Sequence, residues 1–215
     1  LRYRFGLRGT EANFIGFEQN RDMAGLRHLS NLTNCIIKHQ PVVIDYHPFG
    51  KEVIQWTIHP YYLKQYNNRW YLLGYNPEFD DLSIIPLDRI ENVTYTEVTF
   101  KRNLDFNFDA YFRDILGISI EKDKEVEHIR LKFSPQRLPY VISKPIHHTQ
   151  KVEDAAEGII SLYLIPNKEL VSELIWFRDD VEILSPESLR EEIKEIIAKM
   201  YQKYFGVKKD CTTSL

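Results

Sequence analysis

Short β-prone runs separated by turn residues fill the chain between Val42 and Phe100. The runs "VVIDY", "EVIQWTIHPYYLKQY", "RWYLLGYN", "LSIIPLDRI" and "ENVTYTEVTF" are rich in β-branched and aromatic residues, and "HPFGK", "NN" and "PEFDD" separate the first four. Turn chemistry that recurs roughly every 8–12 residues is typical of a small barrel or sandwich. This pattern constrains the fold of the first half more than any other feature.

A helix is predicted before these strands, in "MAGLRHLSNLTNCIIKHQ" at residues 23–40. Apolar residues recur there at three- and four-residue spacing, at Leu26, Leu29, Leu32 or Thr33, Ile36 and Ile37. This spacing places them on one face of a helix, and Pro41 prevents the helix from continuing.

The pattern changes after Phe100. Residues 101–124 are predicted to be a connector that holds a short helix, "FDAYFRDILGI", and a charged run, "EKDKE". From Val126 the expected order is strand, helix, strand ("IHHTQKVE"), strand, helix, strand and a trailing helix, which is the ferredoxin-like arrangement. Asn167 and Ser185 are the expected N-caps of the last two helices, with Pro186 at the first helical position of the second. The tail at 208–215 is predicted to be disordered.

Composition restricts the function. The chain has 28 basic and 31 acidic residues and a net charge of −3, which argues against a dedicated surface for duplex DNA. Its two cysteines, Cys35 and Cys211, have no zinc-like spacing and indicate the cytoplasm. No apolar run reaches the roughly 18–20 residues that span a bilayer, so no membrane association is expected.

Enzymatic chemistry is not predicted. The chain lacks G-x-S-x-G, P-loop, G-x-G-x-x-G and H-E-x-x-H motifs. His147 and His148 are adjacent in an expected strand, where neighbouring side chains face opposite sides and do not share a metal ion. No catalytic residue, metal or cofactor is therefore expected.

Four blocks, "IDY", "HPYYL", "RWYLLGYN" and "PLDRI", resemble in order and spacing the WYL domain of bacterial transcriptional regulators. The motif that gives the family its name stands here at Trp70, Tyr71 and Leu72. The second half resembles the family's C-terminal extension domain through "HHTQKV" and "VEILSPESLREEI".

The resemblance implies an α+β chain with two domains. Residues 23–100 would form a helix and a small Sm-like β-barrel, and residues 125–207 a ferredoxin-like βαββαβ domain with an extra C-terminal helix. It also implies an effector sensor that forms a homodimer and that contacts duplex DNA only through an N-terminal helix-turn-helix domain. That domain is expected before Leu1, with residues 1–22 as its linker.

The candidate site begins from strand alternation in "RWYLLGYN". Trp70, Leu72 and Gly74 share one face, the predicted core, whereas Tyr71 and Tyr75 share the other. Those tyrosine rings could stack on a base, or they could pack under the N-terminal helix.

Arg89 in "PLDRI" is the best cation for an anionic ligand, because its planar fork can pair with a phosphate. The alternative for Arg89 is a salt bridge to Asp88 or to another acid. The resemblance adds Tyr46 and Tyr61 to the pocket and supports Tyr71, and His59 beside them is either a ligand contact or a structural residue. The predicted ligand-binding set is thus Tyr46, His59, Tyr61, Tyr71, Tyr75 and Arg89, and Arg89 is expected to share one cavity with the tyrosines at 46, 61 and 71.

The resemblance implies a small anionic ligand, a nucleotide or another nucleic-acid-derived effector. However, residues 82–86 lack the extra basic residues that many members of the family carry before "LDRI", and a pocket with fewer cations holds a phosphate less strongly. Two alternatives remain open: a structural oligomerisation module without a ligand, and a weak single-stranded nucleic-acid binder with a basic groove between its domains.

Overall fold

The computed structural model describes residues 25–103 and 106–206 and divides the chain into two units, Leu1–Asp105 and Phe106–Leu215. The boundary falls within the stretch that the sequence predicts as the connector. The predicted N-terminal linker at 1–22 and the predicted tail at 208–215 lie outside the described residues. Each unit has its own sheet and its own hydrophobic core.

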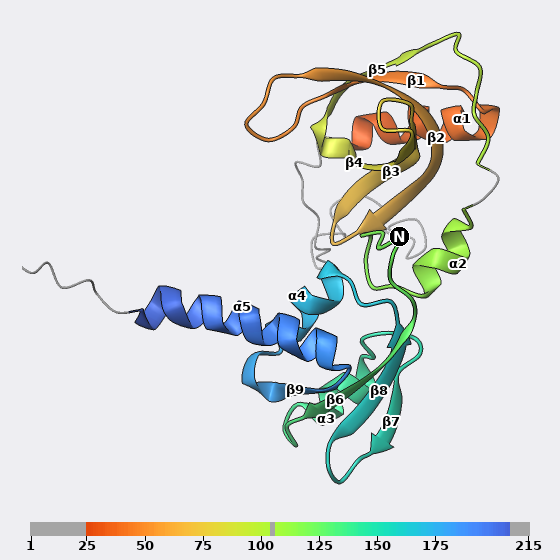
Figure 1. Cartoon of the computed structure of the whole chain (residues 1–215). Helices are drawn as coiled ribbons and strands as arrows, with labels where there is room; N and C mark the ends of the chain where they lie inside the picture. Colours follow the sequence, from red (N-terminus) through yellow and green to blue (C-terminus); the bar gives the residue numbers. More distant parts are fainter. Residues whose placement is uncertain (1–24, 104–105, 207–215) are drawn as a thin grey trace, which may run out of the picture. The chain divides into compact units, whose positions relative to one another are not determined.

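The first unit consists of a helix and a five-stranded antiparallel sheet in the order β4-β3-β2-β1-β5 (Figure 1). Its elements are α1 (Leu26–Lys38), β1 (Val42–Tyr46), β2 (Ile54–Tyr66), β3 (Arg69–Asn76), β4 (Asp81–Pro86), the 3-10 turn η3 (Leu87–Arg89) and β5 (Ile90–Tyr95). The long strand β2 bends, and its pairing with β3 shifts register between Pro60 and Tyr62. A bulge of this kind increases the local bend and twist of a strand. A bent antiparallel sheet with a helix before its first strand is the barrel-like arrangement predicted from the sequence.

The core of this unit lies between α1 and one face of the sheet. It contains Leu32 and Cys35 from α1 together with residues of the sheet and η3, namely Val42, Ile44, Ile58, Leu72, Ile85, Leu87 and Ile90. The hairpin between β2 and β3 turns at Asn67 and Asn68, which have φ angles of 45° and 57°. Two central residues with positive φ suit the two-residue hairpin turn that the "NN" pair predicts.

The buried face of α1 differs from the predicted one. The buried positions are His28, Leu32 and Cys35, whereas Leu26 and Ile37 are exposed, so the predicted apolar face was wrong at these two positions. His28 can be buried because a ring nitrogen lies 3.0 Å from the carbonyl oxygen of Ile90, which accepts its hydrogen bond. Because His28 is hydrogen-bonded, it can occupy the face of α1 that packs on the core. The buried face is therefore rotated about the helix axis relative to the face predicted from apolar residues alone.

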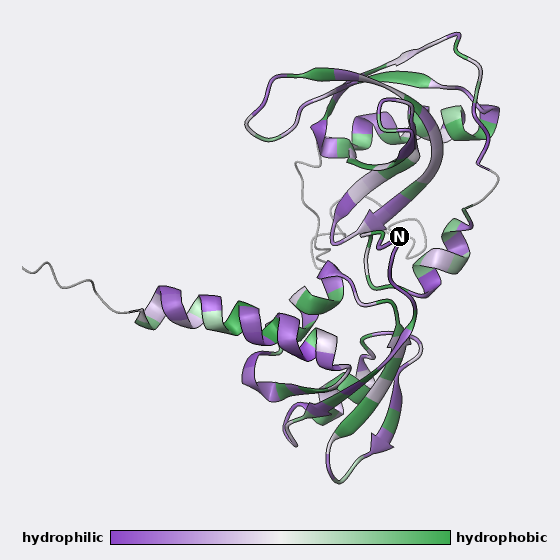
Figure 2. Ribbon diagram, viewed as in Figure 1, coloured by the Kyte–Doolittle hydropathy of each residue, from purple (hydrophilic) through white to green (hydrophobic). Residues whose placement is uncertain are grey.

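The second unit is a four-stranded antiparallel sheet in the order β7-β8-β6-β9 with helices packed against it. Its elements are α2 (Phe108–Arg113), β6 (Glu127–Phe133), α3 (Leu138–Ser143), β7 (Lys151–Asp154), β8 (Ile159–Leu164), α4 (Lys168–Trp176), η4 (Arg178–Asp180), β9 (Val181–Ser185) and α5 (Glu187–Phe205). This order of strands and helices is ferredoxin-like, so the predicted fold class is confirmed. Hydrophobic and hydrophilic residues alternate along β6 (Figure 2), and Ile129, Leu131 and Phe133 face the core.

The predicted strand "IHHTQKVE" is shorter than expected, because β7 begins only at Lys151. The side chain of Gln150 accepts a hydrogen bond from the backbone N–H of Ile146 at 2.9 Å and donates one to the carbonyl of Val141 at 2.9 Å. Side-chain bonds therefore take the place of a strand ladder there. His147 and His148 lie in this turn with ring centroids 4.2 Å apart, so the premise that strand geometry separates them was wrong. Among the described residues, no group of three or more potential ligands could hold a metal ion.

Residues 106–121 pack on the second unit rather than forming a free connector. Asn167 donates from its side-chain amide to the carbonyl of Leu116 at 2.6 Å, and Ile165 N–H donates to the carbonyl of Asp114 at 2.7 Å. Glu169 accepts from the N–H groups of Ile118 and Ser119. Residues 122–126, which follow this stretch and include most of the charged run, are all exposed.

The two predicted helix caps have different outcomes. Asn167 caps α4 as predicted, because its side-chain oxygen accepts a bond from Leu170 N–H at 3.0 Å. Ser185 instead ends β9, and Pro186 occupies the N-cap position of α5, so the Ser185 prediction was wrong. No helix among the described residues is both long and apolar enough to cross a membrane.

Candidate functional site

A pocket of about 290 Å³ lies where the loop after β1 meets η3 and the start of β5. Its described lining residues are His47, Pro48, Phe49, Gly50, Asp88, Arg89 and Glu91. The backbone N–H of His47 donates to the carbonyl of Arg89 at 2.9 Å, and Tyr46 pairs with Ile90 across β1 and β5. These backbone contacts hold the two walls of the pocket together.

Arg89 is the central cation of this pocket. Its guanidinium carbon lies 3.6 Å from the centre of the Phe49 ring, which is cation–π distance. One terminal nitrogen donates to the Tyr46 hydroxyl at 3.4 Å, which is long for a hydrogen bond. Its Nε is buried and has no hydrogen-bond partner. Arg89 therefore has donor capacity that its neighbours leave unused.

The two acids of the pocket each contact a side chain other than Arg89. Asp88 pairs with Arg69 from β3 at 3.1 Å, and Glu91 lies 2.9 Å from Nδ1 of His47, a contact that is an ion pair when the His47 ring is protonated. Among the described residues, no carboxylate forms an ion pair with Arg89, so the salt bridge to Asp88 that was kept as an alternative is not present. The second oxygen of Asp88 is buried without a partner. Arg89 thus has a permanent positive charge in this pocket and forms no ion pair with a described acid.

Tyr46 and Phe49 position Arg89. The Tyr46 ring stacks on Trp56 with centroids 4.6 Å apart and planes 18° apart, and it packs against the core. Phe49 is 75% exposed although its ring covers the guanidinium. Sequence reasoning missed Phe49, and the available signal was an aromatic residue between proline and glycine in a turn.

Three other predicted residues, His59, Tyr61 and Tyr75, form a separate group around Phe100 and Lys101. The backbone N–H of Lys101 donates to His59 Nδ1 at 3.0 Å, and the Tyr61 hydroxyl donates to the Lys101 carbonyl at 2.6 Å. The Lys101 amine lies 3.6 Å from the centre of the Tyr75 ring. Burial lowers the pKa of His59, and the Lys101 charge lowers it further. These side chains hold residues 100–101 against the sheet.

Tyr71 belongs to neither group. It pairs with Lys64 on β2 and Pro86 on β4 and is half-buried on the face of β3 opposite Leu72. Leu72 is fully buried and Trp70 packs against the core, as predicted for that face.

The six predicted residues therefore do not meet in one cavity. Tyr46 points from the core face of β1 toward Arg89, whereas Tyr71 lies on the outer face of β3. Of the six, only Arg89 lines the pocket.

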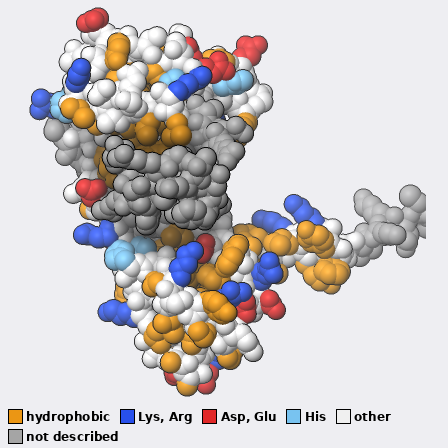
Figure 3. Space-filling view, turned by 180° about the vertical axis from the view of Figure 1, so that it is seen from behind, with side chains coloured by type: hydrophobic (Ala, Val, Ile, Leu, Met, Phe, Trp, Pro, Cys, Tyr) orange, Lys and Arg blue, Asp and Glu red, His pale blue; other side chains and the backbone are white. Residues whose placement is uncertain are grey.

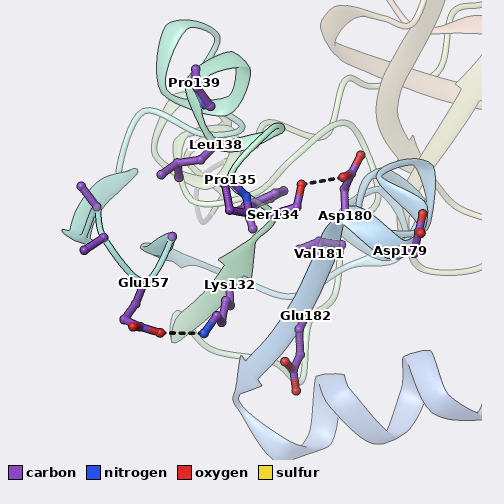
Figure 4. A pocket seen from close by; sticks show the side chains of 14 residues that line it. Lys132, Ser134, Pro135, Leu138, Pro139, Glu157, Asp179, Asp180, Val181 and Glu182 are labelled. Atoms are coloured by element: carbon purple, nitrogen blue, oxygen red, sulfur yellow. Dashed lines mark hydrogen bonds and ion pairs between the residues drawn. The ribbon is translucent and has the colours of Figure 1, made fainter.

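A second pocket, of about 450 Å³, lies in the other unit between the end of β6, α3, the β7–β8 hairpin and the start of β9 (Figure 4). Its acids are largely paired: Glu157 with Lys132 at 2.8 Å, and Asp180 with the Ser134 hydroxyl at 2.6 Å. The hydrogen bonds from Ser134 and Arg137 lower the pKa of Asp180. None of these residues is a predicted ligand-binding residue, and these contacts pair the acids with neighbouring side chains of the same pocket.

Comparison with known proteins identifies both units. The WYL domain family matches residues 27–95, and the WCX domain family matches residues 125–201, so the two matches together cover about two thirds of the chain. The chain therefore carries a WYL domain followed by a WCX domain. Its WYL domain carries the Arg89 pocket, and its WCX domain is the ferredoxin-like unit.

The relatives fit this assignment. The chain is 25% identical over 146 residues to the uncharacterized HTH-type transcriptional regulator YobV of Bacillus subtilis (strain 168). The match covers 67% of this chain and 45% of that protein, so the chain spans under half of the relative's length.

Two solved structures are similar in part. One is described as a CRISPR Cas-related protein, with 11% identity, a TM-score of 0.51 and coverage of 84% of this chain and 52% of that one. Another is the proteasome accessory factor B/C (PafBC) of Arthrobacter aurescens, with 18% identity, a TM-score of 0.38 and coverage of 92% of this chain and 30% of that one.

Proposed function

We propose that this chain is the effector-sensing region of a cytoplasmic bacterial transcriptional regulator. The proposed effector is a small anion, a nucleotide or another nucleic-acid-derived ligand, that binds at Arg89 of the WYL domain. Contact with duplex DNA is assigned to a separate DNA-binding domain, and two copies of the regulator are proposed to form a homodimer. No enzymatic activity is part of this proposal.

The observation that carries the proposal is the uncompensated charge of Arg89. Asp88 pairs with Arg69, Glu91 contacts the His47 ring rather than Arg89, and the Arg89 Nε is buried without a partner. A buried donor without a partner costs free energy, and an anion that accepts its hydrogen bond removes that cost. The planar guanidinium suits a phosphate or a carboxylate, because it can donate two parallel hydrogen bonds.

The size of the pocket limits the ligand. About 290 Å³ is at the lower end of the range for small-molecule sites, about 300–1,000 Å³. This volume suits a phosphate or one nucleotide unit better than a longer strand. The exposed Phe49 ring offers a flat surface on which a base could stack next to the cation.

A route from the pocket to the N-terminal helix is visible in the hydrogen bonds of α1. Arg27 donates to the carbonyl of Glu91 at 2.8 Å, and the His28 ring bonds to the carbonyl of Ile90 at 3.0 Å. Both carbonyls directly follow Arg89 in the chain. We propose that a ligand that displaces Arg89 shifts these bonds, and that α1 transmits the shift to the chain that precedes it.

Titration calorimetry with inorganic phosphate, mononucleotides and short oligonucleotides tests the proposal. Arg89→Ala should weaken binding by about 1.5–3 kcal/mol, the scale of a charge-assisted hydrogen bond. Lys51→Ala is the matched control, because it removes an equal charge from the same loop without lining the pocket. Tyr71→Phe should leave the affinity unchanged, because Tyr71 lies on another face of the sheet.

Thermal melts of the same variants distinguish the alternative of a purely structural module. Trp70→Ala should destabilise the WYL domain by about 2–4 kcal/mol, because the ring packs against the core but stays partly exposed. Arg89→Ala should lower the melting temperature far less. If Arg89→Ala is as destabilising as Trp70→Ala and changes no ligand affinity, Arg89 is structural and the proposed site is wrong.

A further inference from the structure

Two consecutive residues of η3, Asp88 and Arg89, each have a buried polar atom without a hydrogen-bond partner in the described part of the chain. In Asp88 this atom is Oδ1, an acceptor, and in Arg89 it is Nε, a donor. Both residues line the pocket of about 290 Å³ in the WYL domain. The pocket therefore has an unused acceptor and an unused donor on neighbouring residues.

The carboxylate of Asp88 is held in place from its other side. Its Oδ2 lies 3.1 Å from a terminal nitrogen of Arg69 on β3. The turn itself is tied to the loop after β1, because the carbonyl of Arg89 accepts from His47 N–H at 2.9 Å. These two contacts fix the carboxylate and its backbone, so Oδ1 is an acceptor at a defined position in the pocket.

A bare phosphate cannot satisfy both free atoms. Its oxygens accept hydrogen bonds from Arg89, but they are negatively charged acceptors and cannot donate to the carboxylate of Asp88. A buried acceptor that stays unpaired costs free energy. A hydroxyl group differs, because it can accept from Arg89 Nε and donate its own hydrogen to Asp88 Oδ1 at the same time.

The shape of the guanidinium restricts where a ligand must carry this hydroxyl. Nε and the terminal nitrogens of Arg89 belong to one rigid planar group, so the ligand oxygens that they meet are close neighbours. A phosphate on the terminal nitrogens and a hydroxyl on Nε therefore belong to adjacent carbon atoms of the ligand. The 2′-hydroxyl beside the phosphate of a ribonucleoside 3′-phosphate has this arrangement, and the 2′-deoxy form lacks it.

The surroundings of the pocket favour one nucleotide over a long strand. Basic and acidic side chains are scattered singly over the face of the first unit that Figure 3 shows, and the described residues form no continuous basic stripe on that face. A polyanion is normally bound along such a stripe. The small volume of the pocket points to the same class of ligand.

We propose that Asp88 recognises a hydroxyl group beside the phosphate of the effector, so that the site selects ribonucleoside 3′-phosphates over their 2′-deoxy forms. The phosphate pairs with the terminal nitrogens of Arg89. The 2′-hydroxyl accepts from Arg89 Nε and donates to Asp88 Oδ1. The inference rests on the proposed function, since it requires an anion at Arg89.

Titration calorimetry with matched ligands tests this selectivity on the unaltered chain. The probes are the 3′-monophosphates of adenosine, cytidine, guanosine and uridine and their 2′-deoxy counterparts. The best ribonucleotide should bind about ten- to a hundredfold more tightly than its 2′-deoxy form, because the deoxy ligand leaves both charged groups unpaired. The 2′-deoxy-2′-fluoro analogue should bind as weakly as the deoxy form, because fluorine cannot donate to Asp88.

Two variants assign the selectivity to Asp88. Asp88→Ala removes the acceptor and should reduce the ratio of ribonucleotide to deoxynucleotide affinity to below about threefold. Glu91→Ala is the matched control: it removes a carboxylate from the same pocket, so it should change both affinities together and preserve the ratio. Circular dichroism and thermal melts check that each variant is folded, and the ligand comparison on the parent chain requires no variant.

The outcomes separate this inference from the proposed function. Equal affinities for ribonucleotides and deoxynucleotides, or a preference that persists in Asp88→Ala, overturn the role of Asp88 and leave the anion site at Arg89 intact. If inorganic phosphate binds and Arg89→Ala weakens it, but no 3′-monophosphate binds, this inference alone is wrong. If none of the anions binds, the proposed function and this inference are both wrong.

Discussion

His59 is a buried histidine whose ring must accept a hydrogen bond to keep the structure intact. The backbone amide of Lys101 can only donate, so His59 Nδ1 carries no proton in the folded state. Burial and the Lys101 charge both lower the pKa of the ring. Burial is also the main cause of the lowered pKa of His28 on α1.

The lowered pKa values predict a pH dependence of WYL-domain stability. The folded state binds protons less readily than the unfolded chain, whose histidines titrate near about 6.5. Stability is therefore fully present above about pH 6.5 and is lost as the pH falls toward the folded-state pKa. Melts at about pH 7.5 and 5.5 should show a smaller loss for His59→Asn, which keeps an acceptor but does not titrate, than for the parent chain. An equal loss in both would mean that His59 does not contribute, since His28 is unchanged.

Gly74 lies on β3, which has a strand on each side, and pairs with Pro60 on β2 and Ser83 on β4. A Cβ atom at this position would stand 2.5 Å from the carbonyl oxygen of His59 and 2.7 Å from a methyl group of Ile58. We therefore expect Gly74→Ala to destabilise the WYL domain by about 1–3 kcal/mol, the usual cost of overpacking. Gly50→Ala meets no atom within 4 Å, so any cost it shows comes from its positive φ and not from packing. A neutral Gly74→Ala would contradict the close approach of β2.

The sequence could identify Arg89 as the cation of the site but not its surroundings. Whether Asp88 pairs with Arg89 or with Arg69 depends on how β3 lies beside η3, and that geometry involves residues distant in the chain. For the same reason, strand alternation could place Tyr71 and Trp70 on opposite faces but could not show that Tyr46 and Tyr71 lie apart. Strict alternation of side chains along a strand also could not predict the β-bulge at Tyr61.

At the scale of single elements, the asparagine caps have different structural roles. Asn107 caps the short helix α2 through one bond, from Ala110 N–H at 2.9 Å. Asn167 caps α4 and also donates to the carbonyl of Leu116, and it is fully buried. One residue thus fixes both the start of α4 and the chain that leads into the WCX domain.

The two caps should differ in the free energy that their removal costs. Asn107→Ala loses one partly exposed cap and should cost about 0.5–1 kcal/mol. Asn167→Ala also leaves buried backbone groups without partners and should cost about 2–4 kcal/mol. Urea unfolding of the two variants measures the difference, and equal costs would contradict the second role of Asn167.

Element positions were predictable where local chemistry determines them. The strands at 42–46 and 69–76 end at turn residues, and those turns were readable from "HPFG", "NN" and "PEFDD". The prediction failed where side chains satisfy the backbone. Gln150 replaces a strand ladder before β7, and a paired histidine takes a core position on α1.

At the scale of the whole molecule, the two hydrophobic cores predict two separate unfolding events. The first core contains Ile44, and the second contains Leu131, and no residue belongs to both clusters. Ile44→Ala should lower only the transition of the WYL domain, and Leu131→Ala only that of the WCX domain, each by about 2–4 kcal/mol. Scanning calorimetry can assign the two transitions. A single transition that both variants shift equally would contradict two cooperative units.

The central claim is that Arg89 of the WYL domain binds an anionic effector. The most direct measurement follows the arginine Nε–H resonances of the isotope-labelled chain in an NMR titration with phosphate, mononucleotides and short oligonucleotides, with Arg89→Lys used to assign the Arg89 signal. Because the Nε–H of Arg89 has no partner in the structure, the account predicts a saturable shift of this resonance as a ligand accepts its hydrogen bond. The account is contradicted if a ligand binds and perturbs other residues of the WYL domain while the Arg89 resonance stays in place.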